Sequence, residues 1–207
     1  MGISASLGII SVGSEYITMT AADGISTVSA RVMRIDTAVN SGNSGGGLYS
    51  SEGELIGIVN AKISDTSVEN IAYAIPSSVA TSVADNIIDY CYGKDAKTAK
   101  RVMTGLGLVS ANSRADYDEA TGEITLSEVV GVYAVEEGSM ADGLFELNDV
   151  IKSIAHNGKI TEITMRHQVF DLMLDVKAGD TLVFTVERGG AALPIEIVIT
   201  DAYMQSY

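Results

Sequence analysis

The stretch Gly42-Asn43-Ser44-Gly45-Gly46 decides how this chain is interpreted, because it holds a single serine between glycines. Glycine reaches backbone angles that residues with a Cβ resist, so such a run can form a tight turn that presents the serine hydroxyl. The turn also lets the amides of Gly42 and Ser44, with Asn43 between them, point at one spot where an oxyanion can develop. Ser44 is therefore a candidate nucleophile, and Gly42 and Asn43 are candidates for the oxyanion loop.

A serine nucleophile needs a general base, normally a histidine that an aspartate orients. None of the 43 residues before Ser44 is a histidine. His156 precedes a predicted turn, where we expect an exposed side chain, and His167 opens a predicted helix, where it could border a ligand. Lys62 is an alternative base, although a strand lysine is usually solvated. We expect the chain by itself to lack catalytic activity.

The composition narrows the choice of partners. Lys and Arg total 13 against 27 Asp and Glu, a formal net charge of -14 over 207 residues. Phosphate binding needs clustered Lys and Arg, so nucleic acid and anionic membranes are not expected partners. The single Cys91 excludes an internal disulfide framework. No cofactor or metal is expected, since the acidic run Asp116–Glu119 lacks the spacing of a calcium loop.

Residues 1–93 are expected to form mainly β structure that a helix closes. Pro76 marks the helix start, and Val79, Val83 and Ile87 form an apolar stripe at four-residue spacing. The short, polar, basic stretch of residues 94–100 is the predicted linker. The predicted strands are Ser6–Val12, Tyr16–Thr20, Thr27–Ile35, Gly47–Ser50, Leu55–Ile63 and Ile71–Ile75, with turns at Gly13-Ser14 and Ala21–Gly24.

Residues 101–203 are predicted to form a second, small α+β domain. Ser139 is expected to cap a short helix through Leu144, and Thr164 a second helix with one apolar face. Ser110–Thr125 is predicted as a loop or a hairpin. The predicted strands are Thr104–Val109, Gly131–Val135, Val150–Ala155, Thr181–Glu187 and Ile195–Thr200, and the last two are expected to form a hairpin around Gly189-Gly190.

Taken in order, these features resemble the high-temperature-requirement (HtrA) serine proteases. The resemblance is carried by the active-serine segment Arg34–Leu48, by Gly53–Asn60 and by Ile71–Pro76. The second half resembles a PDZ domain, in which Gly105-Leu106-Gly107-Leu108 matches the carboxylate-binding loop and Val132–Ile151 matches the central strand, short helix and next strand. The implied fold class is mainly β with α+β: a partial trypsin-like second β-barrel followed by a PDZ domain.

The sequence also departs from that family. Gly47 stands where proline is frequent, and Ser110–Thr125 is longer than the usual PDZ loop. The first barrel, with the catalytic histidine and aspartate, has no counterpart in the chain, so Met1 is interpreted as an internal residue of a longer protein. The expected organisation is the C-terminal part of a protease domain (1–93), a linker (94–100) and a PDZ domain (101–203).

The resemblance implies an ATP-independent serine endopeptidase that acts on misfolded polypeptides. Asn60, Ala61 and Lys62 would form the strand edge that pairs with substrate, and no acidic residue marks the adjoining pocket, so a small or aliphatic side chain is expected there. The implied peptide-binding residues of the PDZ domain, for which burial in the core is the alternative, are Gly105, Leu106, Gly107, Leu108, Val169, Leu172 and Met173.

The implied partners are polypeptide substrates and apolar peptide C-termini. For the longer parent, the resemblance implies a trimer in the bacterial cell envelope or outside the cell. The alternative function is that of a non-catalytic peptide-binding module.

Overall fold

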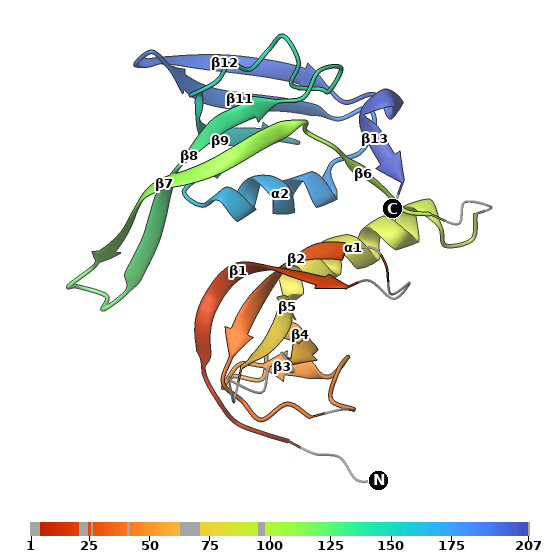
Figure 1. Cartoon of the computed structure of the whole chain (residues 1–207), viewed down its shortest axis with the longest axis vertical. Helices are drawn as coiled ribbons and strands as arrows, with labels where there is room; N and C mark the ends of the chain where they lie inside the picture. Colours follow the sequence, from red (N-terminus) through yellow and green to blue (C-terminus); the bar gives the residue numbers. More distant parts are fainter. Residues whose placement is uncertain are drawn as a thin grey trace. The chain divides into compact units, whose positions relative to one another are not determined.

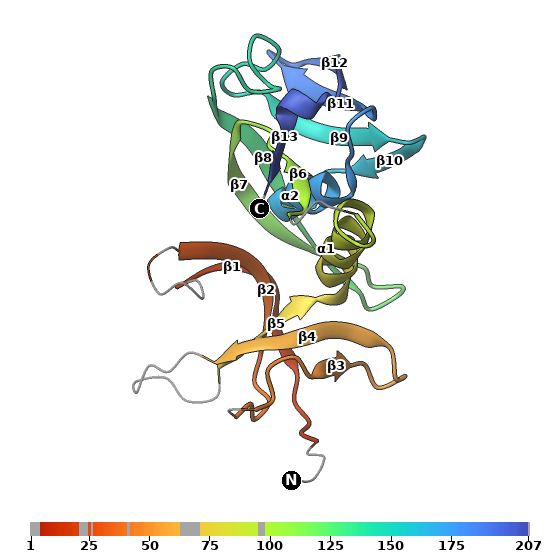
Figure 2. The same ribbon diagram turned by 90° about the vertical axis from the view of Figure 1, so that its right-hand side faces the viewer.

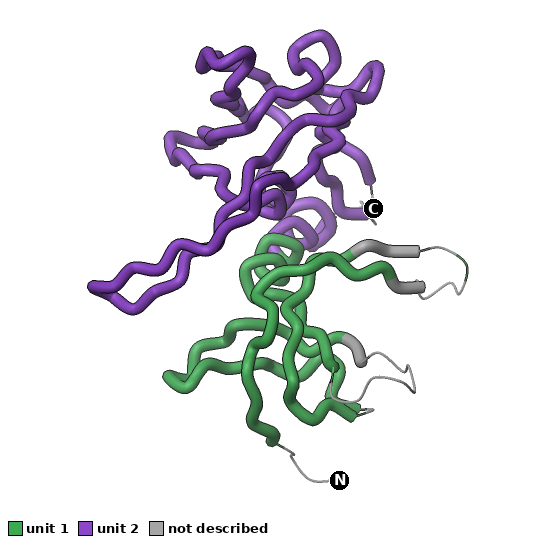
Figure 3. The backbone as a smooth tube through the Cα atoms, turned by 60° about the vertical axis from the view of Figure 1, so that its left-hand side comes forward, with its two compact units in different colours: residues 1–84 green, residues 85–207 purple. Residues whose placement is uncertain are grey.

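The computed structural model describes residues 5–20, 25, 27–40, 42–62, 71–94 and 98–206. It divides the chain into two compact units, Met1–Ala84 and Asp85–Tyr207 (Figure 3). The predicted turn Ala21–Gly24, the end of the predicted strand at Ile63 and residues 95–97 of the predicted linker lie outside the described residues. The division falls within helix α1 (Ser77–Tyr90), and the predicted domain limits stay a prediction.

Unit 1 contains one antiparallel sheet in the order β1-β2-β5-β4-β3 (Figures 1 and 2). The sheet is open, because β1 and β3 form its two edges and do not pair with each other among the described residues. Its strands are β1 (Ile10–Thr20), β2 (Thr27–Ile35), β3 (Gly47–Tyr49), β4 (Leu55–Lys62) and β5 (Ala72–Pro76).

The core of unit 1 is made by its central strands and the segment that follows β2. Leu48 of β3 packs against this core from the edge of the sheet. The buried residues of the cluster are Met33, Ile35, Val39, Val59, Ala72 and Ala74. Several of them are small or medium in size, so this core buries little apolar area per residue.

Strand β1 corrects one prediction. Gly13-Ser14 was predicted as a break between two strands, but the structure has one strand with register irregularities between Ile10 and Glu15. A β-bulge absorbs extra residues while the ladder continues, so the glycine bends the strand and does not end it. Residues 6–9 precede the strand and lie in extended, non-strand backbone.

Unit 2 is built on a sheet in the order β12-β11-β9-β8-β7, with β10 added beside β9 and a separate pair β13-β6. Helix α2 (Arg166–Asp175) packs beside β6 and β7. The strands are β6 (Lys100–Val102), β7 (Leu106–Tyr117), β8 (Ile124–Val135), β9 (Val150–His156), β10 (Lys159–Glu162), β11 (Thr181–Arg188), β12 (Ala191–Val198) and β13 (Met204–Ser206), with a 3-10 turn at Asp201–Tyr203.

The core of unit 2 is continuous from the sheet to α2. Phe145 meets Phe184 edge to face, with ring centroids 5.2 Å apart. Ile154, Leu182 and Val169 are fully buried in the same cluster. No helix in the described part of the chain is both long enough and apolar enough to cross a membrane.

Two helix predictions in unit 2 need correction. Residues 139–144 form successive turns instead of a helix, because Gly138 just before them and Gly143 within them adopt positive φ angles of 76° and 70°. Ser139 still accepts a hydrogen bond at Oγ, from the amide of Ala141. Thr164 does not cap α2: the N-cap is Met165, and the Gln168 side chain reaches back to the amides of both residues.

The region 110–125, for which loop and hairpin were both open, forms a hairpin. Strand β7 runs through to Tyr117 and β8 starts at Ile124, so most of the region is strand. The predicted hairpin at Gly189-Gly190 is present between β11 and β12, where both glycines have positive φ.

Candidate functional site

The serine-bearing segment connects β2 to β3 as a series of tight turns. Gly42 and Gly45 adopt φ angles of 101° and 86°, which a residue with a side chain rarely reaches. The Asn43 amide donates to the carbonyl of Asn40 at 3.0 Å, and the Gly46 amide donates to the carbonyl of Asn43 at 3.0 Å. The glycines on each side of Ser44 therefore have a conformational role, as the sequence predicts.

Strand β4 anchors this loop. The Gly45 amide donates to the carbonyl of Val59 at 2.7 Å, and the Val59 amide donates back to Gly46 at 2.8 Å. The Ser44 hydroxyl donates to the carbonyl of Asn60 at 3.1 Å. The structure thus brings Ser44 beside the first residue of the predicted substrate edge, Asn60; Ala61 and Lys62 follow in β4, and their side chains lie outside the described part.

Two amides of the loop make no hydrogen bond to another described residue. The hydrogen bonds between described residues use the amides of Asn43, Gly45 and Gly46, and none of them uses the amides of Gly42 or Ser44. Those two amides are the predicted oxyanion donors, and Asn43 lies between them in the turn.

The hydroxyl of Ser44 is exposed, and the described residues of unit 1 do not provide a base for it. Its bond goes to a carbonyl oxygen, which cannot accept the proton that a nucleophilic attack releases. Unit 1 has no histidine in its sequence, since both histidines follow residue 84. Unit 1 therefore contains the serine and its loop without an imidazole.

A pocket of about 560 Å³ lies between the serine loop and the extended segment before β1. Its walls include Ile9, Ile10, Val39, Leu48 and Asn43. Ile9 is tied to β2, because its amide donates to Asp36 Oδ1 at 2.7 Å and its carbonyl accepts from the Asp36 amide at 3.3 Å. The lining of this pocket mixes these apolar side chains with polar groups such as Asn43 and Thr37.

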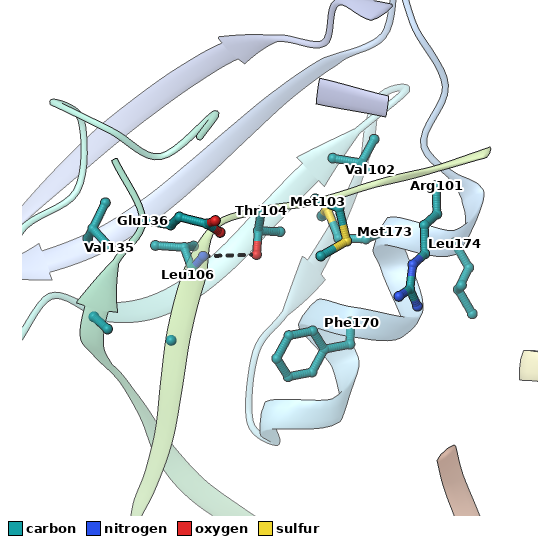
Figure 4. Close-up of a pocket in the computed structure, with 13 residues that line it drawn as sticks. Arg101, Val102, Met103, Thr104, Leu106, Val135, Glu136, Phe170, Met173 and Leu174 are labelled. Atoms are coloured by element: carbon teal, nitrogen blue, oxygen red, sulfur yellow. Dashed lines mark hydrogen bonds between the residues drawn. The ribbon is translucent and has the colours of Figure 1, made fainter. Parts of the chain in front are cut away.

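A second pocket, of about 450 Å³, lies in unit 2 between the start of β7 and α2 (Figure 4). We call it the β7–α2 pocket. One wall is the loop of residues 101–107, and the opposite wall is formed by Phe170, Met173 and Leu174 of α2. Residues 134–136 at the end of β8 complete it.

Gly105 gives the loop of this pocket its shape. Its φ angle is 68°, and a Cβ at this position would lie 2.1 Å from both Cβ and Oγ of Ser139. The Glu136 amide donates to the Gly105 carbonyl at 2.8 Å, which fixes the loop to the end of β8. The Leu106 amide donates to Oγ1 of Thr104 at 3.2 Å, so this amide has a weak local partner that a stronger acceptor can replace.

Four of the predicted groove residues line the β7–α2 pocket: Gly105, Leu106, Gly107 and Met173. Leu106 and Met173 also belong to the buried core, so they form the floor of the pocket. Leu108 and Val169 are buried in the core, and Leu172 packs against the core, so these three do not line it.

Sequence reasoning missed several residues that line the pocket. Phe170 and Leu174 come from α2, while Arg101 and Glu136 come from the ends of β6 and β8. Phe170 and Leu174 are apolar and four residues apart, which places them on one helix face. That spacing was the available signal.

His156 is not the exposed turn residue that the sequence predicts. It ends β9, its side chain is 13% exposed, and its Nε2 lies 2.8 Å from Oδ2 of Asp180. Burial opposes ionisation of Asp180, but the hydrogen bonds from His156 and from the Lys177 amide outweigh burial and lower its pKa. This pair ties β9 to the turn before β11.

The described residues contain no group of three or more His, Cys, Asp or Glu side chains that could hold a metal ion.

Residues 6–84 match the family model described as Trypsin. This match, together with the antiparallel β structure and the positive-φ glycines around Ser44, defines the fold class: unit 1 is trypsin-like.

The chain is similar over most of its length to HtrA-type proteases. It is 27% identical to the serine protease Do-like HtrA of Lactococcus lactis subsp. cremoris, over 96% of this chain and 48% of that protein. It is 30% identical to the serine protease Do-like HtrB of Bacillus subtilis, over 93% of this chain and 41% of that protein. The chain thus spans about half the length, or less, of these relatives.

A solved structure gives the same result. The HtrA-type protease AlgW with decapeptide matches with a TM-score of 0.53 and 25% identity, over 96% of this chain and 56% of that one. The serine endoprotease DegS of Escherichia coli K12 is 24% identical over 93% of this chain and 55% of its own length. These likenesses support a trypsin-like serine protease domain of the HtrA/DegS family.

Proposed function

We propose that this chain carries the nucleophile of an HtrA-like serine endopeptidase that hydrolyses misfolded polypeptides. The observation that carries the proposal is the exposed Ser44 hydroxyl, held on a loop with glycines at positive φ and bonded to Asn60 at the edge of β4. Loop conformation and strand edge together supply a nucleophile beside a place where an extended substrate can pair.

The proposed reaction is acyl transfer. Ser44 Oγ attacks the scissile carbonyl, and the amides of Gly42 and Ser44 receive the oxyanion that forms. The proton from Oγ goes to an imidazole, and unit 1 contains none, so the base comes from outside unit 1. Asn60, Ala61 and Lys62 pair with the substrate backbone.

In isolation the chain is expected to be inactive. Loss of the base from a serine triad costs several orders of magnitude in rate. The test is hydrolysis of casein and labelling by a fluorophosphonate probe, each compared with the Ser44→Ala variant. We expect the two proteins to be indistinguishable; turnover that Ser44→Ala abolishes would overturn the inactivity and locate a base within this chain.

The same variant tests the nucleophile in the longer protein. The longer protein would carry a histidine and an aspartate in β-rich sequence before residue 1. We expect such a protein to degrade reduced, unfolded substrates faster than folded ones. Ser44→Ala should abolish this activity. Activity that survives Ser44→Ala would refute the role of Ser44.

For unit 2 we propose a PDZ-type module that binds apolar peptide C-termini. For the longer protein we propose a homotrimer. The β7–α2 pocket supports this function, because the Leu106 amide has only a weak partner and Phe170, Met173 and Leu174 offer an apolar wall. Binding without catalysis is also the alternative function of the whole chain, since unit 2 has its own buried core and pocket while unit 1 contains no histidine.

The outer edge of β7 is open to a ligand strand. Val132, opposite Leu108, bonds through both its amide and its carbonyl to residues 148 and 149, so this pair exchanges no backbone bonds across the β7–β8 ladder. The backbone of Leu108 therefore faces away from β8. Its carbonyl accepts a bond from Arg166 Nη1 at 3.4 Å, a long contact that a ligand amide can replace.

Peptides ending in Val, Leu or Phe test the binding function by NMR titration. Chemical shifts are expected to concentrate at residues 104–110 and 167–174, with affinity on the order of micromolar because a short peptide is ordered on binding. Amidation of the peptide C-terminus should remove the binding. Equal binding of amidated peptides would show that the loop does not recognise a carboxylate.

A further inference from the structure

Strands β7 and β8 continue past the rest of the sheet of unit 2 as a two-stranded ribbon (Figure 1). Strand β8 meets β9 at the pair Gly131 and Val150. Farther out, residues 114–117 pair with residues 124–127, and neither segment has another strand partner among the described residues. We call residues 114–127 the arm.

One face of the arm is apolar. Cross-strand partners share a face, as do residues two apart along a strand. The pairs Tyr117–Ile124 and Ala115–Leu126 therefore lie on one face, where Tyr117, Ile124 and Leu126 are 64%, 66% and 58% exposed. The opposite face carries polar side chains, namely Arg114, Asp116, Thr125 and Ser127.

This apolar face continues the core face of the sheet. Val132 and Val130 are buried, and steps of two residues along β8 lead from them through Glu128 to Leu126 and Ile124. The register irregularity between Ala111 and Arg114 is a bulge whose extra residue lies in β7. Side chains along β8 therefore keep alternating between the two faces of the sheet. The arm thus presents a core-type face at a place where no described element covers it.

The apolar face also continues the ligand groove. A pocket of about 230 Å³ lies at the base of the arm, where the two faces meet α2. It is lined by Ala115, Leu126 and Glu128 from the apolar-face rows, by Ser113, Arg114 and Ser127, and by Met165 at the start of α2. Met165 is the N-cap of α2, whereas the β7–α2 pocket lies against the C-terminal half of the same helix. A chain that leaves the β7–α2 pocket along β7 therefore reaches the base of the arm and then its apolar face.

We propose that the arm binds the upstream part of a polypeptide whose C-terminus occupies the β7–α2 pocket. The ligand is an extended apolar segment flanked by Lys or Arg. This inference rests on the binding function proposed for unit 2. A ligand strand adds about one residue for each residue of β7, so the arm contacts positions about eight to ten residues upstream of the terminus.

The charge of the turn at the tip of the arm and the small area of its apolar face both favour a peptide segment with basic flanks as the ligand. The turn of the arm carries Asp118, Glu119 and Glu123, and the Ala120 amide bonded to Asp118 lowers the pKa of that carboxyl. An acidic turn favours basic flanks and repels anionic surfaces. Three large side chains expose on the order of a few hundred Å², well under the roughly 800 Å² per partner of a stable protein interface. The face therefore suits a peptide segment better than a folded partner.

The test compares a five-residue peptide that ends in Leu with a twelve-residue peptide that shares its last five residues and has Ile, Leu and Lys upstream. Each is titrated into the full chain and into a variant that combines Tyr117→Ser, Ile124→Thr and Leu126→Thr. These residues are exposed, so the variant is expected to fold. Thr125→Ala on the polar face of the arm is the matched control.

We expect the long peptide to bind the unaltered chain and the control about tenfold more tightly than the short one. The triple variant should lose this gain and keep the affinity for the short peptide. No gain with length, or a gain that survives the triple variant, would overturn the role of the arm. Concentration-dependent dimers that the triple variant abolishes would assign the face to a second copy and also overturn it.

Amidated versions of both peptides separate the two proposals. If amidation changes nothing while the length-dependent gain is still lost in the triple variant, the carboxylate site fails and the arm stands. If amidation abolishes binding of the short peptide and length has no effect, the carboxylate site stands and the arm fails.

Discussion

Unit 2 buries a closed core and exposes apolar side chains on the arm outside that core, whereas unit 1 leaves apolar side chains exposed beside its own core. Phe184, Leu182 and Ile154 of unit 2 are fully buried. In unit 1, Leu7 and Ile9 are 97% and 67% exposed beside the open pocket of the serine loop. The difference teaches that contacts within unit 2 are enough to stabilise it. Unit 1, in contrast, depends on contacts that its own open sheet does not supply.

The largest expected effect comes from separating the units. A chain of residues 85–207 should unfold cooperatively in urea and give dispersed NMR spectra, because it contains the whole unit 2 core. A chain of residues 1–84 should associate or fail to fold, since it exposes two strand edges and an apolar face. Light scattering and circular dichroism measure both. A monomeric, cooperatively folded 1–84 chain would contradict the comparison.

A buried ion pair in unit 2 is the next target. The Asp149 carboxylate is fully buried and accepts from Arg188 Nε and Nη2 at 2.7 Å, and the Glu146 amide donates to it at 2.9 Å. Asp149→Asn leaves the guanidinium without its main partner and is expected to destabilise unit 2 by about 3 kcal/mol in urea unfolding. Glu137→Gln, at an exposed acidic position that makes no described ion pair, serves as the control.

The same pair gives unit 2 a pH dependence. The bonds from Arg188 hold the pKa of Asp149 below its ordinary value, although burial opposes this. The stabilisation is therefore fully present above about pH 4, the unfolded value, and is lost as pH falls through the lower folded pKa. Asp149→Asn should flatten the acid limb of unit 2 stability. An unchanged acid limb would assign the pH dependence to other carboxylates.

Substitutions at two glycines in unit 2 distinguish the cost of backbone strain from the cost of a steric clash. Gly105 and Gly122 have φ angles of 68° and 75°, but only at Gly105 would a Cβ meet Ser139. Gly122→Ala should cost about 1 kcal/mol through its backbone, and Gly105→Ala about 2 kcal/mol or more. Gly105→Ala should also weaken peptide binding. Equal losses of unfolding free energy in the two variants would show that the loop at Gly105 moves away from Ser139 without cost.

The smallest expected effect is at the edge of unit 1. Arg34 donates from Nε and Nη2 to both oxygens of Glu15 at 2.7 and 2.6 Å, which ties β1 to β2 and lowers the pKa of Glu15. The pair is partly exposed, so Glu15→Gln should cost no more than about 1 kcal/mol. Hydrogen exchange of the β1 amides measures it. Exchange unchanged by Glu15→Gln would mean that backbone pairing alone holds β1.

Local patterns predicted most elements and failed where a contact distant in sequence decides. The predicted strand Thr27–Ile35 and the 189–190 hairpin agree with the structure, because alternation and paired glycines are local signals. The predicted helix capped by Ser139 was wrong, because Gly138 before it and Gly143 within it take positive φ and the segment forms turns. Val169 was assigned to a groove because periodicity identifies an apolar helix face without saying what covers it.

The sequence by itself determined the serine loop, since glycines at 42 and 45 and the absence of histidine before Ser44 are properties of the chain. It also determined the trypsin-like class of unit 1 and its mainly β character. Only the tertiary structure decided that Ser44 meets Asn60, that Phe170 and Leu174 face the start of β7, and that the apolar face of the arm is uncovered. The physical reason is that each of these facts joins residues far apart in the chain, and spacing along a chain does not report which elements pack together.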